Sequence, residues 1–236
     1  MGKRRPFVDS RKPVELRVPE KFKRERETPP IRAMNDNQLT YLKALSRSEQ
    51  VIVMGPAGTG KTYLAATHAA DKLRKHDVTK VYLTRPNVPG GRSLGFFKGD
   101  MDEKIAPWVV PLTETMKDRM GAGAFETALG KSIVIVPFEV MRGRTFKDCV
   151  VILDEAQNTT PEEMKMFLTR IGENCQVIIN GDVSQSDLKS NSGLSTIIKM
   201  IDRHEMPVPI IEFTLDDIVR SGVCEMWVRA FHASGI

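Results

Sequence analysis

Short apolar runs alternate with amphipathic stretches along most of this chain. The apolar runs carry no regular polar positions, which is typical of strands covered by helices on both faces of a parallel sheet. The stretches between them space their apolar residues three or four positions apart and predict helices. The alternation predicts a three-layer α/β sandwich. The expected strands are 50–54, 80–85, 133–136, 149–153, 176–180 and 209–214, and the expected helices are 35–47, 61–75, 102–120, 162–171, 194–203 and 223–232.

Local signals fix several of the helix ends. Asn35 and its neighbours offer N-caps to the first helix, and Pro161 is suited to the first turn of the fourth. Trp108 and Trp227 fall on predicted amphipathic helices, and we expect both rings in the core.

The composition excludes several classes of protein. The 236 residues are 41% hydrophobic and 28% charged, which excludes collagen-like and wholly disordered chains. No stretch approaches the roughly 18 apolar residues that a membrane helix needs, and the basic start lacks the apolar run of a signal peptide. We therefore expect a cytoplasmic protein with no membrane partner. The three cysteines and four histidines have no ligand spacing, so neither a disulfide scaffold nor a zinc site is expected.

Positive charge is concentrated at the start of the chain. Residues 1–32 hold eleven Lys or Arg and five Asp or Glu, whereas the remaining residues are nearly neutral. This proline-punctuated segment has few large apolar residues, so we expect a flexible basic arm at 1–32 and one folded domain at 33–236. The arm either contacts a nucleic-acid backbone or serves as a solubilising tail.

A glycine-rich segment lies between the first predicted strand and the helix after it. It matches the phosphate-binding pattern G-x-x-x-x-G-K-[ST] in the place where that pattern functions, because the glycines let backbone N–H groups face phosphate. We expect Lys61 to contact the β and γ phosphates of ATP and Thr62 to bind Mg²⁺. The expected nucleotide-binding residues are Gly55, Pro56, Ala57, Gly58, Thr59, Gly60, Lys61 and Thr62.

Two carboxylates follow the apolar run 149–153. In a parallel sheet the end of this strand meets the glycine-rich segment, so Asp154 is expected beside Thr62 as the second Mg²⁺ ligand. Glu155 is expected to accept the proton of an attacking water. Its alternative role is a surface ion pair or a helix N-terminal charge.

Polar residues also follow the strand predicted at 176–180. Gln185 is a candidate for sensing the γ phosphate or orienting the water, because ligands of open parallel sheets bind at this edge. Asp182 and Asp187 either belong to that site or form turns. Upstream, Gln38 lies at a spacing at which it could read an adenine edge.

Long sequence runs resemble the PhoH family of P-loop ATPases. They include Met141-Arg-Gly-Arg144, Val151 through Gly172, Asn180 through Leu188 and Asp217-Ile-Val-Arg220, and the resemblance spans about residues 34–233. It implies a P-loop NTPase fold of the RecA-like type, similar to the core of superfamily 1 helicases, and an ATPase acting on RNA or single-stranded nucleic acid. It also assigns adenine reading to Gln38 and γ-phosphate sensing to Gln185. Some relatives carry a PIN-type ribonuclease domain, for which this chain has no room.

A helicase of that superfamily donates arginines from a second, similar domain, which this chain lacks. An arginine finger is worth about 10³–10⁵ in rate, so we expect one from the distal end of the same chain or from a neighbouring subunit. The candidates are Arg220, Arg142 and Arg144, each of which could instead be a surface or ion-pairing arginine. The resemblance implies a homo-oligomeric ring, a hexamer, with sites at the subunit interfaces.

A second basic region surrounds the glycine-rich stretch near residue 90. Arg85, Arg92 and Lys98 interleave with Phe96 and Phe97, a combination suited either to nucleic acid or to a protein interface. The leading hypothesis is therefore an oligomeric, ATP-dependent nucleic-acid motor. Helicase unwinding is a further step, because a ring of single domains could instead translocate, remodel or clamp. The alternative is a ring that nucleotide assembles as a platform for a protein partner.

Overall fold

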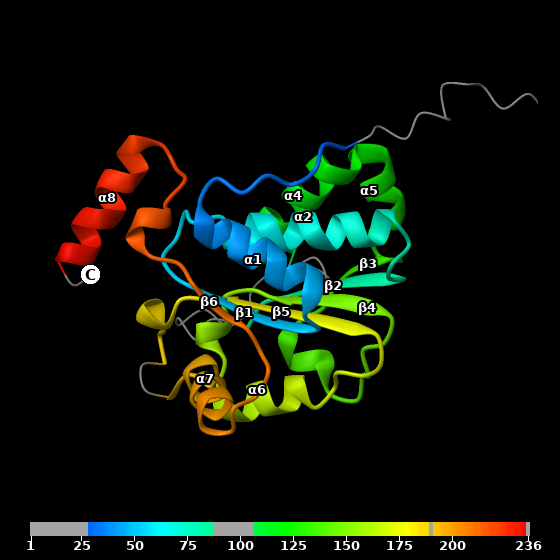
Figure 1. Cartoon of the computed structure of the whole chain (residues 1–236). Helices are drawn as coiled ribbons and strands as arrows, with labels where there is room; N and C mark the ends of the chain where they lie inside the picture. Colours follow the sequence, from blue (N-terminus) through cyan, green and yellow to red (C-terminus); the bar gives the residue numbers. More distant parts are fainter. Residues whose placement is uncertain (1–27, 87–105, 189–190, 235–236) are drawn as a thin grey trace, which may run out of the picture. The chain divides into compact units, whose positions relative to one another are not determined.

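Six parallel strands form the sheet of the computed structural model, which describes residues 28–86, 106–188 and 191–234. The chain divides after Pro30, and everything described below lies in Ile31–Ile236. The strands lie in the order β3-β2-β4-β5-β1-β6 (Figure 1). Their bounds are β1 Gln50–Met54, β2 Lys80–Thr84, β3 Ile133–Ile135, β4 Cys149–Leu153, β5 Cys175–Gly181 and β6 Ile210–Glu212.

Helices cover both faces of the sheet, as the alternating pattern predicted (Figure 1). One face packs against α1 (Asp36–Arg47), α2 (Lys61–Arg74), α4 (Val110–Met120) and α5 (Ala122–Ala128). The other packs against α6 (Pro161–Leu168), α7 (Gly193–Arg203) and the short 3-10 helix η4 (Phe138–Met141). Every residue of β4 and β5 is buried, which explains why β4 and the centre of β5, 177–179, are continuously apolar in the sequence.

Most predicted elements are confirmed, with differences at their ends. The helix expected from 102 begins as the 3-10 helix η3 (Ala106–Val109) and becomes α-helical at Val110, while 102–105 lie outside the described residues. The helix expected to reach Ile171 ends at Leu168, and a capping box between Thr160 and Glu163 sets its start. The short helix α5 was not predicted, because its seven residues contain only one large apolar side chain, Phe125, and therefore show no helical period.

The two tryptophans are not in the core, so that expectation was wrong. Trp108 is 40% exposed and Trp227 is 55% exposed. Trp227 lies on the C-terminal helix α8 (Gly222–Ala233), which has no buried residue. Periodicity identifies the apolar face of a helix, but it does not say whether another element covers that face.

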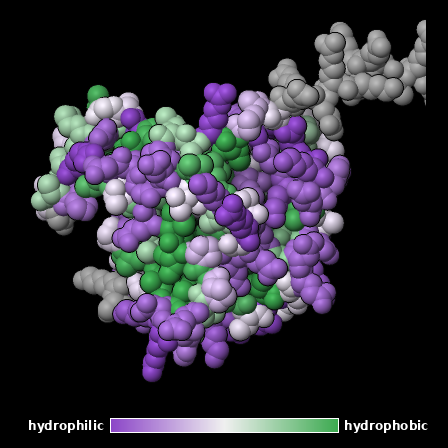
Figure 2. Space-filling model, viewed as in Figure 1, coloured by the Kyte–Doolittle hydropathy of each residue, from purple (hydrophilic) through white to green (hydrophobic). Residues whose placement is uncertain are grey.

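Apolar side chains are also exposed elsewhere. Figure 2 shows hydrophobic residues gathered over the β6 edge of the sheet, and Met200 and Met206, which precede β6 in the chain, are 48% and 43% exposed. Within the described ranges, no helix combines the length and apolar content needed to cross a membrane. The three cysteines are free thiols, although the Sγ atoms of Cys149 and Cys175 lie 3.5 Å apart on neighbouring strands.

Candidate nucleotide-binding site

The glycine-rich segment joins β1 to α2 in backbone conformations that favour glycine. Gly55, Gly58 and Gly60 have φ angles of +132°, +87° and +90°. A Cβ on Gly55 would also collide with the carbonyl oxygen of Phe213. Gly60 forms the N-cap of α2, so the loop ends at a helix N-terminus whose N–H groups attract anions.

Lys61 folds back onto this loop. Its Nζ donates hydrogen bonds to the carbonyl oxygens of Gly55 at 2.6 Å and Pro56 at 2.8 Å. Burial lowers the pKa of Lys61, and nearby carboxylates, Asp182 foremost, oppose that shift. The ammonium group is therefore held at the loop by neutral acceptors, which phosphate oxygens can replace.

Asp154 lies beside Thr62, as the sequence predicted. The Thr62 hydroxyl donates to Oδ1 of Asp154 at 3.2 Å, and the Asn180 amide donates to the same oxygen at 3.2 Å. The Tyr41 hydroxyl in turn donates to Oδ1 of Asn180 at 3.3 Å. Burial raises the pKa of Asp154, and the neighbouring Glu155 raises it further. A buried carboxylate in these surroundings is stabilised by a bound cation.

The donor set at this position fits Mg²⁺. Asp154 and Thr62 offer a carboxylate and a hydroxyl, the hard oxygen ligands that Mg²⁺ prefers. Among the described residues, no group of three or more His, Cys, Asp or Glu side chains could hold a metal ion. The remaining ligands would be phosphate oxygens and water, which is the usual arrangement for Mg²⁺ bound with a nucleotide.

Glu155 adopts the left-handed backbone conformation, with φ of +55°. This conformation is uncommon for a residue other than glycine and is found preferentially at functional sites. Its Oε2 accepts a 2.6 Å hydrogen bond from Nε2 of Gln157, and its Oε1 lies 3.8 Å from a guanidinium nitrogen of Arg85. The carboxylate is thus held from two sides at the end of β4.

Gln157 is a site residue that the sequence prediction missed. It is buried, and while Nε2 donates to Glu155, its Oε1 accepts the backbone N–H of Asp182 at 3.0 Å. One amide therefore connects the acidic pair after β4 to the segment after β5. Its place two residues beyond Glu155 was the only available signal, because the contact with Asp182, which follows β5, depends on strand order.

Asp182 shapes the turn after β5 and also lines the cavity described below. Its Oδ1 accepts hydrogen bonds from the Ser184 backbone at 3.0 Å and hydroxyl at 2.6 Å, which shapes the turn after β5. Its Oδ2 is buried and has no hydrogen-bond partner among the described residues. Asp187 is exposed and does not line the cavity described below, so its placement fits the turn alternative.

The two glutamines assigned to nucleotide recognition occupy different environments. Gln185 is exposed and lines the cavity. Gln38 is buried, its Oε1 accepting the backbone N–H of Met34 at 2.9 Å and its Nε2 donating to the carbonyl of Thr59 at 3.0 Å. Because each end of an amide can make a second hydrogen bond, these contacts leave Gln38 able to meet a base.

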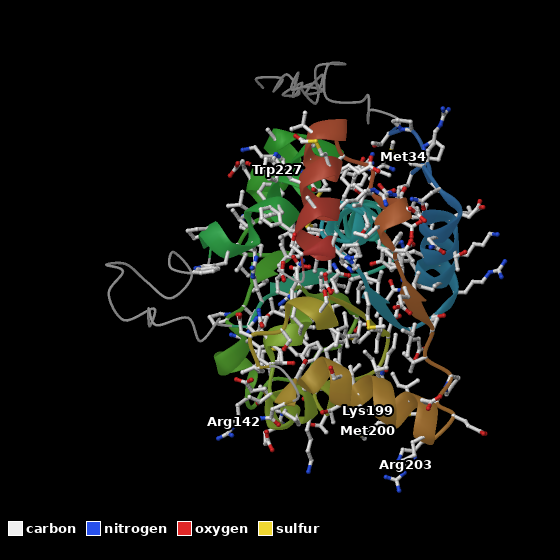
Figure 3. All side chains as sticks on the ribbon, turned by 90° about the vertical axis from the view of Figure 1, so that its left-hand side faces the viewer. Met34, Arg142, Lys199, Met200, Arg203 and Trp227 are labelled. Carbon is white, nitrogen blue, oxygen red and sulfur yellow. The ribbon has the colours of Figure 1, made fainter. Side chains whose placement is uncertain are left out.

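The three candidate finger arginines are separated by the fold. Arg220 lines the cavity described below, and its Cγ lies 2.8 Å from the position that a Cβ on Gly58 would occupy. Arg142 and Arg144 are exposed and do not line this cavity. Figure 3 shows Arg142 at the lower margin of the molecule, pointing outward. Within one subunit, the structure thus brings only Arg220 of these three to the site.

The site contains a cavity of about 650 Å³, a volume suited to a small-molecule ligand. Arg85, at the end of β2, also lines it, whereas Arg92, Phe96, Phe97 and Lys98 lie outside the described residues. The lining contains Gln38, Gly55, Ala57, Gly58, Gly60, Lys61, Thr62, Asp154, Glu155, Gln185 and Arg220.

A family model described as "PhoH-like protein" matches residues 30–232. The chain belongs to the PhoH-like family. Over 211 residues it is 44% identical to Protein PhoH of Escherichia coli K12, covering 87% of this chain and 59% of that protein. It is also 44% identical over 204 residues to the PhoH-like protein of Bacillus subtilis, covering 85% of this chain and 64% of the relative. The chain thus spans about three fifths of the length of these PhoH relatives.

Structural comparison places this PhoH-like chain among known P-loop folds. It is similar to the large terminase of a thermophilic bacteriophage, with a TM-score of 0.54 and 14% sequence identity. The match covers 84% of this chain and 50% of the terminase. The likeness concerns the fold, and it agrees with the RecA-like arrangement that the PhoH resemblance implied.

Proposed function

We propose that this PhoH-like chain is a Mg²⁺-dependent ATPase. The observation that carries the proposal is the meeting of the glycine-rich loop with Asp154 and Glu155 in one cavity. A phosphate-binding loop, a metal-binding carboxylate and a second carboxylate are the parts that nucleotide hydrolysis requires.

In the proposed reaction, Lys61 and the loop N–H groups bind the phosphates, and Thr62 and Asp154 hold Mg²⁺. The bound Mg²⁺ supplies positive charge that offsets the charge developing on the phosphate oxygens. Glu155 accepts one proton from a water molecule as the oxygen of that water bonds to the γ phosphorus. The bond from that phosphorus to the β,γ-bridging oxygen breaks, and its electron pair stays with ADP. Gln185 orients the water, and Arg220 stabilises the charge on the transferred group.

We further propose that the protein acts on RNA or single-stranded nucleic acid as an oligomeric motor. The resemblance to helicase cores supports this role, and so does the net positive charge of residues 1–32. Helicase activity is one form that such a motor could take. Arg142 and Arg144, which are exposed and do not line the cavity of their own subunit, would then be available to a neighbour in a hexameric ring.

A ring that serves as a platform for a protein is the second candidate. The uncovered apolar face of α8 favours it, because Val223, Met226, Trp227 and Phe231 are all about half exposed or more. Surfaces of this kind are common where another protein binds.

Steady-state ATP hydrolysis, with and without a mixed-sequence single-stranded RNA, tests these proposals. Glu155→Gln should reduce kcat by about 10²–10⁴-fold, the usual contribution of a general base. Glu162→Gln, at an exposed position on α6, is the matched control and should leave kcat unchanged. Equal turnover in both variants would overturn the role of Glu155 as the base, and a parent protein that does not hydrolyse ATP would overturn the ATPase proposal.

Nucleic-acid stimulation separates the motor from the platform. RNA that raises turnover severalfold, with loss of the effect on deletion of residues 1–32, would support the motor. Turnover that rises with protein concentration but ignores RNA and DNA would support the platform. Light scattering with and without ATP then measures whether a ring forms, and a monomer under every condition would exclude both oligomeric proposals.

A further inference from the structure

Strand pairing places Arg85 beside the acidic pair. In the register of β2 and β4, Thr84 lies opposite Leu153, so the residues that follow, Arg85 and Asp154, leave the sheet side by side. The Asp154 backbone N–H also donates to the carbonyl oxygen of Thr84 at 3.0 Å. Arg85 therefore enters the cavity from the neighbouring strand, opposite the glycine-rich loop in the strand order.

The guanidinium group of Arg85 is held mainly by Trp108. Its Cζ lies 5.6 Å from the centre of the Trp108 ring, and one terminal nitrogen donates to the Trp108 carbonyl oxygen at 3.3 Å. The Trp108 ring thus contacts the guanidinium group through a cation–π interaction, which needs no hydrogen bond to the face of the ring. The result is a cation fixed in position by an aromatic neighbour.

Arg85 retains unused hydrogen-bonding capacity toward the cavity. Its Nε is buried and has no partner among the described residues. Its closest carboxylate oxygen, Oε1 of Glu155, lies 3.8 Å away, which is beyond hydrogen-bond distance. A guanidinium group offers five N–H donors in a planar fork that matches phosphate oxygens. A buried donor of this kind without a partner favours an anionic ligand.

We propose that Arg85 binds the terminal phosphate of ATP from within the same subunit, exchanging its loose pairing with Glu155 for the phosphate oxygens. The exchange leaves Oε1 of Glu155 open to the attacking water, while Gln157 continues to hold Oε2. Arg85 thereby distinguishes ATP from ADP and stabilises the charge on the transferred group. This inference rests on the proposed ATPase function and adds a catalytic residue to that site.

The test compares nucleotide affinity and turnover in Arg85→Ala, Arg85→Lys and Arg203→Ala. Arg203 is an exposed arginine at the end of α7, labelled in Figure 3, and its replacement is the matched control. Competition with a fluorescent nucleotide measures ATP and ADP affinity in a Glu155→Gln background, where hydrolysis is suppressed. Turnover is measured with Glu155 intact, and circular dichroism confirms that each variant is folded.

Arg85→Ala should weaken ATP binding about tenfold, as loss of a charged contact does, with ADP binding unchanged. It should lower kcat by about 10²–10³-fold, the usual loss for one preorganised donor to a transition state. Arg85→Lys should recover part of the ATP affinity but little of kcat, because lysine keeps the charge and loses the fork. Arg203→Ala should match the parent protein in every assay.

Equal loss of ATP and ADP affinity in Arg85→Ala would overturn the inference, because it would show a structural role. Turnover within twofold of the parent would overturn it too. If Arg85→Ala does not fold, Trp108→Leu provides the second variant, since it keeps Arg85 but removes the ring, and it should lower kcat with ADP affinity retained. A parent protein that does not hydrolyse ATP would refute the ATPase proposal itself, so the two failures are distinguishable.

Discussion

Aromatic residues at the cavity end of the sheet and on α8 have opposite environments. Tyr41 is fully buried, packs edge-to-face on Phe213 and donates through its hydroxyl to Asn180 beside Asp154. Trp227 stacks on Phe231 with ring centres 5.7 Å apart, yet remains 55% exposed. Both lie on amphipathic helices, so the difference arises from what covers each helix. Aromatic packing in the first region supports the candidate nucleotide-binding site, whereas in the second it leaves an apolar surface exposed.

The largest expected effect comes from deleting the buried ring. Tyr41→Ala should lower the free energy of unfolding by about 3–5 kcal/mol, the usual cost of removing a large buried aromatic side chain. Tyr41→Phe keeps the ring and removes the hydroxyl, so it should cost only about 0.5–1.5 kcal/mol. Urea denaturation measures both values. Similar losses in the two variants would mean that the hydroxyl, rather than the ring, carries the stability.

A smaller effect is expected from the amide that connects Glu155 to the turn after β5. Gln157→Ala removes the donor to Oε2 of Glu155 and the acceptor for the Asp182 backbone N–H. We expect kcat to fall about 10–100-fold, because a misplaced base loses its alignment with the water. The KM for ATP should stay within twofold in steady-state assays. A raised KM with normal kcat would instead assign Gln157 to ATP binding.

A further prediction concerns how the stability of the fold depends on pH through His68, on the face of α2 that packs on the sheet. His68 contacts Oε1 of Gln176 at 2.8 Å, and burial lowers the pKa of His68 from its ordinary value of 6.5. Below pH 6.5 the unfolded chain then binds a proton that the folded chain does not, so stability should fall as the pH decreases toward 5. The hydrogen bond to Gln176 and the charge of Asp71 oppose this lowering of the His68 pKa, whereas the charges of Lys72 and Lys75 add to it.

Denaturation midpoints at pH 7, 6 and 5 measure this dependence. His68→Gln should flatten the decline, and His204→Gln, at an exposed histidine, should leave it unchanged. A decline of equal slope in the His68 variant would assign it to other groups.

The smallest effect is expected on α8. Trp227→Ser should change the free energy of unfolding by less than about 0.5 kcal/mol, as exposed substitutions usually do. Thermal unfolding at low protein concentration measures the change without self-association. A loss of more than about 2 kcal/mol would show that α8 is covered in the free protein and would remove the contrast between the two regions.

Much of the fold was readable from local patterns. Apolar runs identified the buried strands because both faces of β4 and β5 are covered, and Asn35 and Pro161 marked where α1 and α6 begin. The glycine-rich loop was equally readable, since its positive φ angles require glycine at fixed positions. The placement of Asp154 beside Thr62 followed from the rule that parallel strands end at one edge of a sheet.

The sequence by itself determined the elements, the phosphate-binding loop and the two carboxylates, because these depend on backbone geometry and on periods of a few residues. Only the tertiary structure decided which distant side chains complete the site. Arg85 reaches Glu155 because β2 pairs with β4, and Gln157 reaches Asp182 because β5 lies beside β4. The tertiary structure also decided that Trp227 is exposed, because burial depends on contacts between elements and not on the pattern within one helix.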